Sequence, residues 1–518
     1  MAVDHIIIGS GINALVAAAM LGLKGQRVLV LEREAVAGGC LRTDEVTLPG
    51  FRHDVMAATW VLFMTSPAGG LLGPHLARHG FDYCHTPHPT AVLRPDGQAL
   101  VLTTDRGANI KAFNALAAED GARHGRDVGA IEADAPFLFS LLGGALWSWP
   151  TAKLLFGQVR KRGLRGLAAW MGSALAPARG WLEGYSSPLV QALWAPWVLH
   201  CGLTPESTYS AQMGKVVAFA LEAAGAPIVK GGSGAAVAAF RGLIAENGGE
   251  IRCVADVSRI SVHNGRVNGV VLASGETISC RSVLASVAPS QLYDRLLGGE
   301  NLPEDKAAVA GFRHGRGNFQ LHYALDAVPE WTAAGLEQVA LIHLADGIDS
   351  VSKSANEAER GLLPEVPTIC VGQPSRLDPS RCPDGKAVLW LQIPDAPRVI
   401  KGDAAGTIAA RDWDSAREAF ADRIEAILSR HIKDFDKIKL ARRAYSPADL
   451  AAMNINLVGG DPYGGACSID QFFIWRPFAH STNGVGPVRG LIHIGASTHP
   501  GPGLGGGSGF NAAKRLGG

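Results

Sequence analysis

The first 32 residues constrain the fold of this chain more than any other stretch. Val3–Ile8 is a short apolar run, which predicts a buried parallel strand. Ala14–Leu23 is rich in alanine and leucine, which predicts a helix that ends before Gly25. Arg27–Leu31 predicts a second strand. A strand, a helix and a strand in this order form the unit from which open α/β sheets with parallel strands are built.

The turn between the first strand and the helix reads Gly9-x-Gly11-x-x-Ala14. Gly9 permits a tight turn, Gly11 lets a pyrophosphate approach the backbone, and Ala14 is small enough for the helix to pack on the strand. The start of the helix offers unpaired N–H groups to phosphates, and Glu32 can accept hydrogen bonds from ribose hydroxyls. This order predicts a dinucleotide site; the alternative is an ordinary strand–helix–strand unit whose glycines serve packing alone.

The next residues indicate which dinucleotide binds. Glu32-Arg33, Gly38-Gly39 and Arg42-Thr43 resemble the motif that follows this fingerprint in two-domain flavoproteins of the amine oxidase and phytoene desaturase group. The resemblance implies that FAD approaches the backbone at Gly38 and Gly39. It implies that the following residues bind the cofactor: Gly9, Ser10, Gly11, Ile12, Asn13, Ala14, Glu32, Arg33, Gly38, Gly39, Cys40, Leu41, Arg42 and Thr43.

Cys40 has two interpretations. Its thiol could touch the flavin and react, or Cys40 could be a small residue that contacts FAD through its backbone. The sequence holds no C-x-x-C pair, and the second interpretation is the one we expect. We also expect FAD to be bound without a covalent link.

The other end of the chain carries a second glycine-rich loop. Leu491–Ile494 predicts a strand, and Phe510–Leu516 predicts a helix. The stretch GASTHPGPGLGGGSGFNAA starts at residue 495, directly after the strand, and extends into the helix. The loop resembles the C-terminal flavin motif of phytoene desaturase-like and carotenoid isomerase-like oxidoreductases. The resemblance implies that the ribityl chain and the isoalloxazine ring contact Gly495, Thr498, His499, Pro500, Gly503, Leu504 and Gly505.

His499 is the one catalytic residue that the sequence suggests. A histidine titrates near neutral pH, so His499 could polarise the flavin or transfer a proton. Alternatively, it holds the loop in place through hydrogen bonds, and both interpretations stay open at this point.

Residues 230–289 resemble the second FAD-binding block of the same family. The sequence predicts a helix over Ala235–Asn247, a strand over Ile251–Val254 and a hairpin that turns at Asn264-Gly265. A further strand is predicted over Ser282–Ser286. The resemblance implies that Val257 contacts adenine through its backbone and that Ala285 and Ser286 end a strand whose tip faces the cofactor; without the resemblance, Gly231-Gly232 would be only a turn.

Together these blocks predict an α/β fold with a discontinuous, Rossmann-like FAD-binding domain. We expect that domain to comprise residues 1–55, 225–290 and 465–518, because SIDQFFIWRP at 468–477 also fits the family. An interleaved α+β substrate-binding domain would comprise residues 56–224 and 291–464.

Residues 158–170 suggest a contact with a membrane. Gln158–Trp170 carries Arg160, Lys161, Arg162 and Arg165 within a tryptophan-rich region, which is typical of a basic amphipathic helix on an anionic bilayer. The alternative is a core helix with a solvated basic face. Phytoene desaturases handle very apolar substrates, so the resemblance adds support to peripheral membrane contact, and both interpretations stay open.

Composition excludes several classes of protein. The net charge of +1 argues against nucleic-acid binding, which a basic stripe would accompany. Eight scattered cysteines without a C-x-x-C pair argue against a zinc knuckle or a redox dithiol, so we expect no metal site and a reducing, cytoplasmic setting. We expect no signal peptide and no spanning helix, since the sequence has no run of about 20 apolar residues.

The sequence therefore predicts an FAD-dependent oxidoreductase. It would act as a dehydrogenase or desaturase that takes a hydride from a small apolar substrate and passes the electrons to oxygen, a quinone or another acceptor. A second strand–GxGxxG–helix unit, as in disulfide reductases, is absent from the sequence. The alternatives are a flavin-dependent amine oxidase, a non-redox isomerase that uses reduced FAD, and a non-enzymatic escort-type binding protein.

Overall fold

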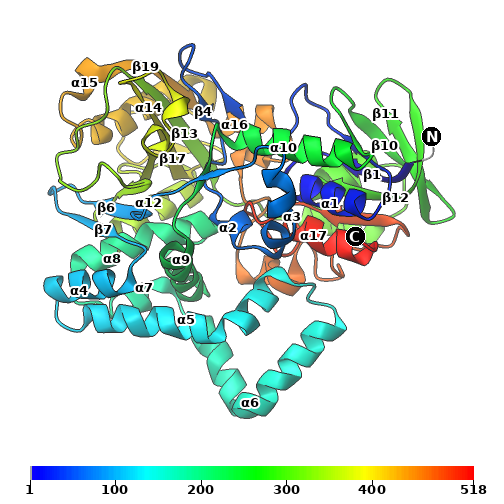
Figure 1. The fold of residues 1–518 in the computed structure, drawn as a ribbon, viewed down its shortest axis with the longest axis horizontal. Coiled ribbons are helices and arrows are strands. Elements are labelled where there is room, and N and C mark those ends of the chain that lie inside the picture. The colour runs from blue at the N-terminus through cyan, green and yellow to red at the C-terminus, as the bar shows by residue number, and fades with distance from the viewer. Residues whose placement is uncertain (1–2) are drawn as a thin grey trace.

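The computed structural model describes residues 3–518 and contains two seven-stranded sheets (Figure 1). Residues 1 and 2, at the start of the predicted first FAD-binding segment, lie outside this range. The first sheet has the order β10-β11-β12-β1-β2-β9, and β20 pairs with β12. Its strands are β1 (Val3–Ile8), β2 (Val28–Leu31), β9 (Glu250–Arg252), β10 (Val257–His263), β11 (Arg266–Leu272), β12 (Thr277–Ser286) and β20 (Leu491–Ile494).

Strands from three distant parts of the chain are neighbours in the first sheet. β1 is parallel to β2 on one side and to β12 on the other, and β12 is parallel to β20. The predicted Rossmann-like α/β architecture is thereby confirmed, with β1 and β20 at their predicted bounds. The boundaries that we assign to the two domains stay predictions.

Three helices pack on this sheet and begin earlier than predicted. They are α1 (Ile12–Leu23), α10 (Ser233–Glu246) and α17 (Gly507–Arg515). Each starts directly after a glycine at its N-cap, whereas the sequence led us to treat the glycines and their neighbours as loop. β12 is also longer than predicted, because Thr277 pairs with Val271 in an antiparallel extension towards β11.

The two ends of the chain meet between α1 and α17, next to each other in Figure 1. A Cβ atom at Gly509 would lie 1.8 Å from the carbonyl oxygen of Asn13, so the two helix backbones touch without any side chain between them. The core of this region also includes Trp60, Phe63 and Phe81. That part of the predicted substrate segment therefore packs on the helices of the first sheet.

The second sheet has the order β19-β13-β17-β16-β14-β6-β7. One face packs on α14 (Trp413–Leu428) through a mainly apolar core that contains Phe319, Leu321 and Phe420. The strands are β6 (Thr90–Leu93), β7 (Ala99–Leu102), β13 (Gly317–Leu325), β14 (Leu341–Leu344), β16 (Ile369–Gly372), β17 (Ala387–Ala396) and β19 (Lys439–Tyr445).

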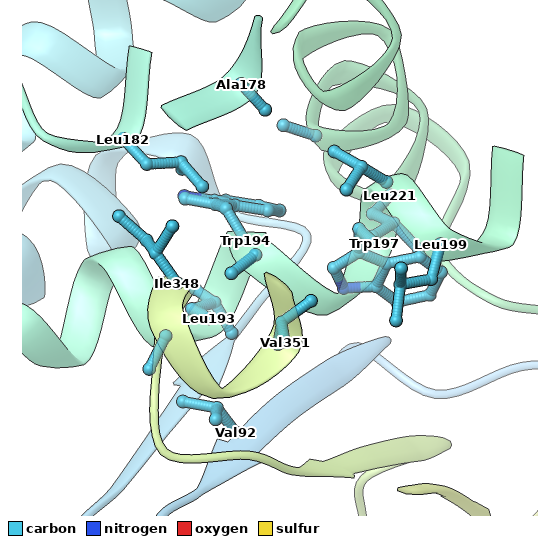
Figure 2. Packing of buried hydrophobic residues seen from close by; sticks show 14 of the residues in the cluster. Val92, Ala178, Leu182, Leu193, Trp194, Trp197, Leu199, Leu221, Ile348 and Val351 are labelled. Carbon is cyan, nitrogen blue, oxygen red and sulfur yellow. The ribbon is translucent and has the colours of Figure 1, made fainter. Parts of the chain in front are cut away.

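Helices cover the other face of the second sheet. Figure 2 shows the packing there, with Trp194 and Trp197 among aliphatic side chains from several elements. These helices are α4 (Arg106–Leu116), α5 (Asp120–Gly143), α7 (Ala178–Leu182), α8 (Pro188–Trp194), η1 (Ala195–Cys201), α9 (Ser210–Ala224) and α12 (Ile348–Glu359).

Shorter elements connect the two regions. The small strands are β3 (Thr43–Asp44), β4 (His53–Asp54), β5 (Tyr83–Cys84), β8 (Ile228–Val229), β15 (Leu362–Leu363) and β18 (Gly402–Asp403). The remaining helices are α2 (Val61–Met64), α3 (Pro67–Ala77), η2 (Gln291–Leu296), α11 (Pro303–Ala310), α13 (Pro374–Leu377), η3 (Pro379–Arg381), α15 (Phe435–Ile438), α16 (Pro447–Met453), η4 (Val458–Gly460), η5 (Ile469–Gln471) and η6 (Phe473–Trp475).

Helix α6 (Trp149–Ala174) stands apart from both regions. Figure 1 shows it as a V-shaped arm that projects from the body of the protein. The vertex is Gly163, whose φ of 69° and ψ of 166° break the helix inside the predicted amphipathic segment. No helix in residues 3–518 combines the length and apolar character needed to cross a bilayer.

Arg381 is a buried cation that joins the two regions. Its side chain is fully buried, and its guanidinium donates to Asp378 at 2.8 Å and to Asp54 at 2.9 Å. It also donates to the carbonyl of Val229. Asp54 in turn accepts the backbone N–H of Ser233 at 2.7 Å, at the start of α10. Arg381 thus fixes the approach of the second region to the first.

We expect Arg381→Met to lower the free energy of unfolding by about 3–5 kcal/mol, because it leaves two buried carboxylates without their cation. Urea denaturation followed by circular dichroism measures this change. The exposed Arg126 offers a matched control, and Arg126→Met should change stability by less than about 0.5 kcal/mol. Equal effects of the two substitutions would contradict the role of Arg381.

Candidate functional site

A single cavity of about 2020 Å³ connects the first sheet to the helices that cover the second. One end lies at the tips of β1, β2 and β12, where Gly9, Glu32 and Ser286 line it. This is the carboxyl edge of the parallel strands, where open α/β sheets bind their ligands. We call the other end the chamber; it is lined by Trp197, His200 and Cys201, by side chains between Met213 and Ala224, by the base of the arm between Ala135 and Leu154, and by Asn318, Gln320, Trp390 and Gln392.

The turn after β1 has the backbone that a phosphate site requires. Gly9 has a φ of +86°, and a Cβ atom there would lie 2.9 Å from the carbonyl oxygen of Ser286. Only glycine fits this position without strain. A Cβ atom at Gly11 would meet nothing within 4 Å, and no side chain caps the start of α1. The open backbone and the uncapped helix N-terminus fit a pyrophosphate.

Ser10 and Glu32 build the wall beside this turn. Glu32 accepts the backbone N–H of Ser10 at 3.0 Å, the hydroxyl of Ser10 at 2.5 Å and the backbone N–H of Glu34 at 3.0 Å. The hydroxyl oxygen of Ser10 accepts the N–H of Gly38 at 2.8 Å. Glu32 therefore orders the glycine-rich segments at 9–11 and 38–39 as well as lining the cavity. A carboxylate retains acceptor capacity beyond these bonds, as binding to ribose requires.

The C-terminal loop is tied to the N-terminal helix. Asn13 accepts the hydroxyl of Ser508 at 2.8 Å, and that hydroxyl accepts the N–H of Gly495 at 2.8 Å. These two bonds place the loop from Gly495 to Gly506 against the start of α1. The two glycine-rich segments that the sequence singled out thus line one cavity.

Arg476 supports the same loop from behind. It is almost completely buried, and its guanidinium donates to the carbonyl of Ala496 at 2.9 and 3.0 Å and to that of Tyr463 at 2.5 Å. Tyr463 and Ala496 both line the cavity. Because its donors all go to backbone oxygens, the buried Arg476 holds the two loops together. In the sequence, only the resemblance of residues 468–477 to the family drew attention to this segment.

Most of the predicted cofactor residues line the cavity. They are Gly9, Ser10, Gly11, Ile12, Asn13, Glu32, Arg33, Gly38, Gly39, Cys40, Leu41, Arg42, Val257, Ser286, Gly495, Pro500, Gly503, Leu504 and Gly505. The carbonyl of Val257 also accepts a hydrogen bond from Arg295 at 2.9 Å, so its backbone already has one protein partner. That these residues bind a cofactor stays our prediction.

Four predicted cofactor residues are placed behind the wall of the cavity instead. Ala14 and Ala285 are fully buried in packing contacts. The hydroxyl of Thr498 donates to the carbonyl of Gly495 at 3.0 Å and closes a turn. The hydroxyl of Thr43 donates to Asp54 at 2.7 Å and accepts the N–H of Gly234 at 2.9 Å. In each case the residue shapes the protein around the cavity, and direct contact of these four residues with a cofactor stays a prediction.

His499 also lies outside the lining of the cavity, although its neighbour Pro500 belongs to it. The Nε2 atom of His499 lies 3.0 Å from the carbonyl oxygen of Gly144 and donates to it. Burial lowers the pKa of His499 to about 4, so the ring is neutral at physiological pH. These contacts favour the second interpretation, in which His499 anchors the loop to the end of α5. A catalytic role stays a prediction.

Cys40 lines the cavity with a protonated thiol. Burial raises the pKa of Cys40 to about 11, and the side-chain amide of Asn454 lies 3.7 Å from its sulfur. A thiol with a raised pKa is a weak nucleophile at neutral pH. The structure thus favours Cys40 as a small wall residue over Cys40 as a reactive group.

Sequence reasoning missed a large part of the site. Residues 453–457 and 462–464 line the middle of the cavity, and the chamber walls come from α9, η1, β13 and β17. Their sequences carry no motif. The alternation of polar Asn318 and Gln320 with apolar Phe319 and Leu321 on β13 was the one available signal, because it predicts a strand with one polar face.

Charge is confined to one end of the cavity. In the part of the chain from residue 3 onwards, the acidic side chains and the lysines and arginines that line the cavity all lie on the first sheet and its helices: Glu32, Arg33, Glu34, Arg42, Asp256, Arg295, Lys514 and Arg515. The chamber is lined instead by apolar side chains such as Trp197, Met213 and Phe219, with a few neutral amides, some hydroxyl groups and the imidazole of His200. The chamber is therefore suited to an uncharged molecule.

Two family patterns match the chain. The pattern described as an NAD(P)-binding Rossmann-like domain matches residues 7–85, which contain the turn at Gly9 and Gly11. The pattern described as flavin containing amine oxidoreductase matches residues 114–446. The second match covers more than half of the chain.

Several proteins are similar to this chain over almost its whole length. Pyridine nucleotide-disulfide oxidoreductase domain-containing protein 2 from Mus musculus is 27% identical, over 98% of this chain and 92% of its own. A limonene dehydrogenase polypeptide from Castellaniella defragrans is 25% identical, over 99% of this chain and 94% of its own. Hydroxyneurosporene desaturase from Cereibacter sphaeroides is 25% identical, over 96% and 94%.

A solved structure shares the fold. An oxidoreductase from Methanosarcina mazei superposes with a TM-score of 0.61 at 14% identity, and the match covers 99% of this chain and all of that one. This likeness supports the fold described above.

We expect Gly11→Val to prevent cofactor binding without unfolding the protein. Gly11 has a φ of −66° and a ψ of 173°, which valine adopts readily, and its Cβ position is open. The valine side chain would occupy the space beside the start of α1. Flavin retained per polypeptide after purification should fall below about a tenth of the wild-type value.

Gly129→Val is a matched control, because Gly129 lies on α5, outside the cavity, and its Cβ position is also open. This variant should retain the wild-type flavin content. A Gly11→Val protein that purifies with normal flavin would show that the phosphate site lies elsewhere.

Proposed function

The chain belongs to the family of flavin containing amine oxidoreductases and is an FAD-dependent oxidoreductase; on this premise we propose that it removes a hydride from an apolar organic substrate. The enzyme would act as a dehydrogenase or desaturase. The names of two relatives, a limonene dehydrogenase polypeptide and hydroxyneurosporene desaturase, agree with a substrate of this class.

One observation carries the proposal: the cavity joins the nucleotide end to a chamber without charged walls. An apolar molecule that enters the chamber gains about 25 cal/mol for each Å² of apolar surface removed from water. A cation or a carboxylate would lose its hydration there and find no opposite charge on the chamber walls of the described chain. The same fact argues against the alternative of an amine oxidase for charged amines.

The protein supplies binding and orientation for this reaction. FAD, when bound, provides the hydride acceptor; the second hydrogen leaves the neighbouring carbon as a proton, which is released to solvent. Gly9, Gly11 and the start of α1 would hold its pyrophosphate, and Glu32 would hold its ribose. The loop from Gly495 to Gly506 would hold its ribityl chain and isoalloxazine ring. The aromatic and aliphatic walls of the chamber exclude water and orient the substrate. Membership of an oxidoreductase family favours an enzyme over an escort-type binding protein.

We further propose that the arm rests on a membrane that dissolves the substrate. Trp149 and Leu164 are each 74% exposed, and Phe156 and Met171 are also exposed on the same helix. Arg160, Lys161 and Arg165 are exposed between them. No acidic residue occurs between Asp134 and Glu183. Exposed apolar side chains with basic neighbours match the surface of an anionic bilayer.

The base of the arm supports a route from the membrane to the chamber. Side chains between Ala135 and Leu154, where α5 ends and α6 begins, line the cavity. A substrate that leaves the bilayer along the arm would therefore enter the chamber without crossing open water.

Product analysis tests the proposed reaction. We expect the purified protein, given ferricenium as electron acceptor and a panel of terpene and polyene hydrocarbons, to form a product that has lost two hydrogens from at least one of them. Mass spectrometry detects this change. Cyclohexylmethylamine, a cation of the size of a monoterpene, should not be oxidised, because the chamber walls carry no counter-charge.

Two results would contradict this assignment. Oxidation of the amine and of no hydrocarbon would favour an amine oxidase. A product of unchanged mass with a displaced double bond, formed only after reduction of the flavin, would favour an isomerase.

Sedimentation with vesicles tests the arm. We expect the protein to bind vesicles that contain phosphatidylglycerol, and a variant with Arg160→Ala, Lys161→Ala and Arg165→Ala to bind them about a hundredfold more weakly, since each basic side chain near an anionic surface is worth about 1 kcal/mol. High salt should weaken binding of the wild type in the same way.

A matched control removes three exposed arginines from the first sheet, which lies away from the arm in Figure 1. The variant with Arg259→Ala, Arg266→Ala and Arg281→Ala should bind the vesicles like the wild type. Equal losses in both triple variants would show that net charge, and not the arm, determines the binding.

A further inference from the structure

A row of polar side chains crosses the second sheet beneath the chamber. His343 on β14 is paired with Cys370 on β16, Cys370 with Gln392 on β17, and Gln392 with Gln320 on β13. Cross-strand partners point to the same face of a sheet, so these side chains lie side by side. Gln320 and Gln392 line the cavity.

This face is unusual for a buried sheet. The opposite face of the same strands carries mainly apolar side chains, among them Phe319, Leu321 and Ile393. Burial of a polar side chain costs free energy unless the side chain is hydrogen-bonded. The oxygen atoms of the Asn318 and Gln320 side chains are buried and have no hydrogen-bond partner in residues 3–518. Polar side chains in such a place point to a ligand that hydrogen-bonds.

A histidine pair stands at the end of this row. The Nε2 atoms of His200, on η1, and His343 lie 2.9 Å apart. Trp197 packs against both rings, with its ring centroid 4.9 Å from the centroid of each. Figure 2 shows Trp197 beside the aliphatic side chains of the adjacent core. Of the two histidines, His200 lines the cavity and His343 is buried behind it.

The hydrogen bond between the rings decides where the protons lie. Both rings are neutral, because burial lowers the pKa of His200 to about 4 and that of His343 well below its usual value. The Nδ1 atom of His343 has no partner in the described chain. A buried N–H without an acceptor is rarer than an unfilled lone pair. His343 therefore donates its Nε2–H to His200, and His200 carries its proton on Nδ1.

We propose that His200 forms a binding subsite for an uncharged oxygen group, a hydroxyl or a carbonyl, on an otherwise apolar substrate. Its Nδ1–H would donate to that oxygen. The neutral amides of Gln320 and Gln392 make the neighbouring part of the chamber wall polar. This inference rests on the proposed function, since it specifies one end of the molecule that the chamber would hold. A charged group is excluded from the subsite by the lack of a counter-charge on the chamber walls of residues 3–518.

A metal ion is the competing explanation for this cluster. The ligand atoms of His200, His343 and Cys370 all lie within 4.8 Å of one another. A metal on His200 and His343 would replace the hydrogen bond between their rings, and it would require the thiolate of Cys370, whose pKa burial raises strongly. The geometry of a direct ring-to-ring hydrogen bond favours the metal-free pair.

Binding of two matched probes tests the subsite. The probes are farnesol and the hydrocarbon that lacks its hydroxyl, and the readout is the dissociation constant obtained from the shift in flavin absorption. We expect the wild type to bind farnesol about three- to tenfold more tightly, as one hydrogen bond provides. His200→Phe should abolish this preference and leave the affinity for the hydrocarbon within about twofold.

Further variants separate the explanations. His200→Asn places an amide N–H near the position of Nδ1 and should restore part of the preference. His431→Phe makes the same aromatic substitution at a buried histidine outside the cavity and should keep the wild-type preference. If His200→Phe fails to fold, the comparison of wild type with His200→Asn still measures the subsite.

Three outcomes would overturn the proposal, and each is distinct. Equal affinity of the wild type for both probes would remove the subsite and leave the apolar chamber intact. Binding of neither probe would instead contradict the proposed function. Stoichiometric zinc in the purified protein, lost in Cys370→Ser, would assign the cluster to a metal ion.

Discussion

The parallel pairing of β1 with β12 is the contact on which the rest of this structure depends. It joins Val3–Ile8 to Cys280–Ala285, and the same strand β12 then pairs with Leu491–Ile494. Three remote segments therefore end their strands at one edge of one sheet. The turn at Gly9 lies against Ser286, and the loop after β20 reaches the start of α1 through Asn13 and Ser508. Any shift in this register would separate the two glycine-rich segments and with them the two halves of the cavity.

The cavity that results has two chemically different ends, and this difference follows from the elements that form each end. The first sheet contributes strand tips, a helix N-terminus and the charged residues around Glu32, which suit a dinucleotide. The second region contributes α9, η1 and the face of a sheet, and their side chains are apolar or neutral. A flavin bound where the two ends of the cavity join would contact a desolvated substrate. Arg381 and Arg476 maintain this junction, one between the two regions and one behind the C-terminal loop.

The parts of the site that were predictable from sequence are those whose function demands a local backbone. Gly9, Gly11 and the loop from Gly495 are visible because a tight turn or a close approach permits few residues. Helix starts were less predictable, since Gly11, Gly232 and Gly506 serve as N-caps although they read as loop. Thr43 and Thr498 belong to motifs, yet their hydroxyls bond to the protein. The chamber could not be predicted, because the convergence of His200, His343 and Gln392 depends on strand pairing across long separations.

The central claim is that one cavity brings a flavin and an uncharged substrate together. The most direct test is the visible absorption spectrum of the purified protein, recorded before and after anaerobic addition of an apolar hydrocarbon from the substrate panel. The account predicts the absorption bands of oxidised flavin, and their bleaching by a hydrocarbon without any other reductant. A colourless protein that takes up no added FAD, or a flavin that amines bleach and hydrocarbons do not, would contradict it.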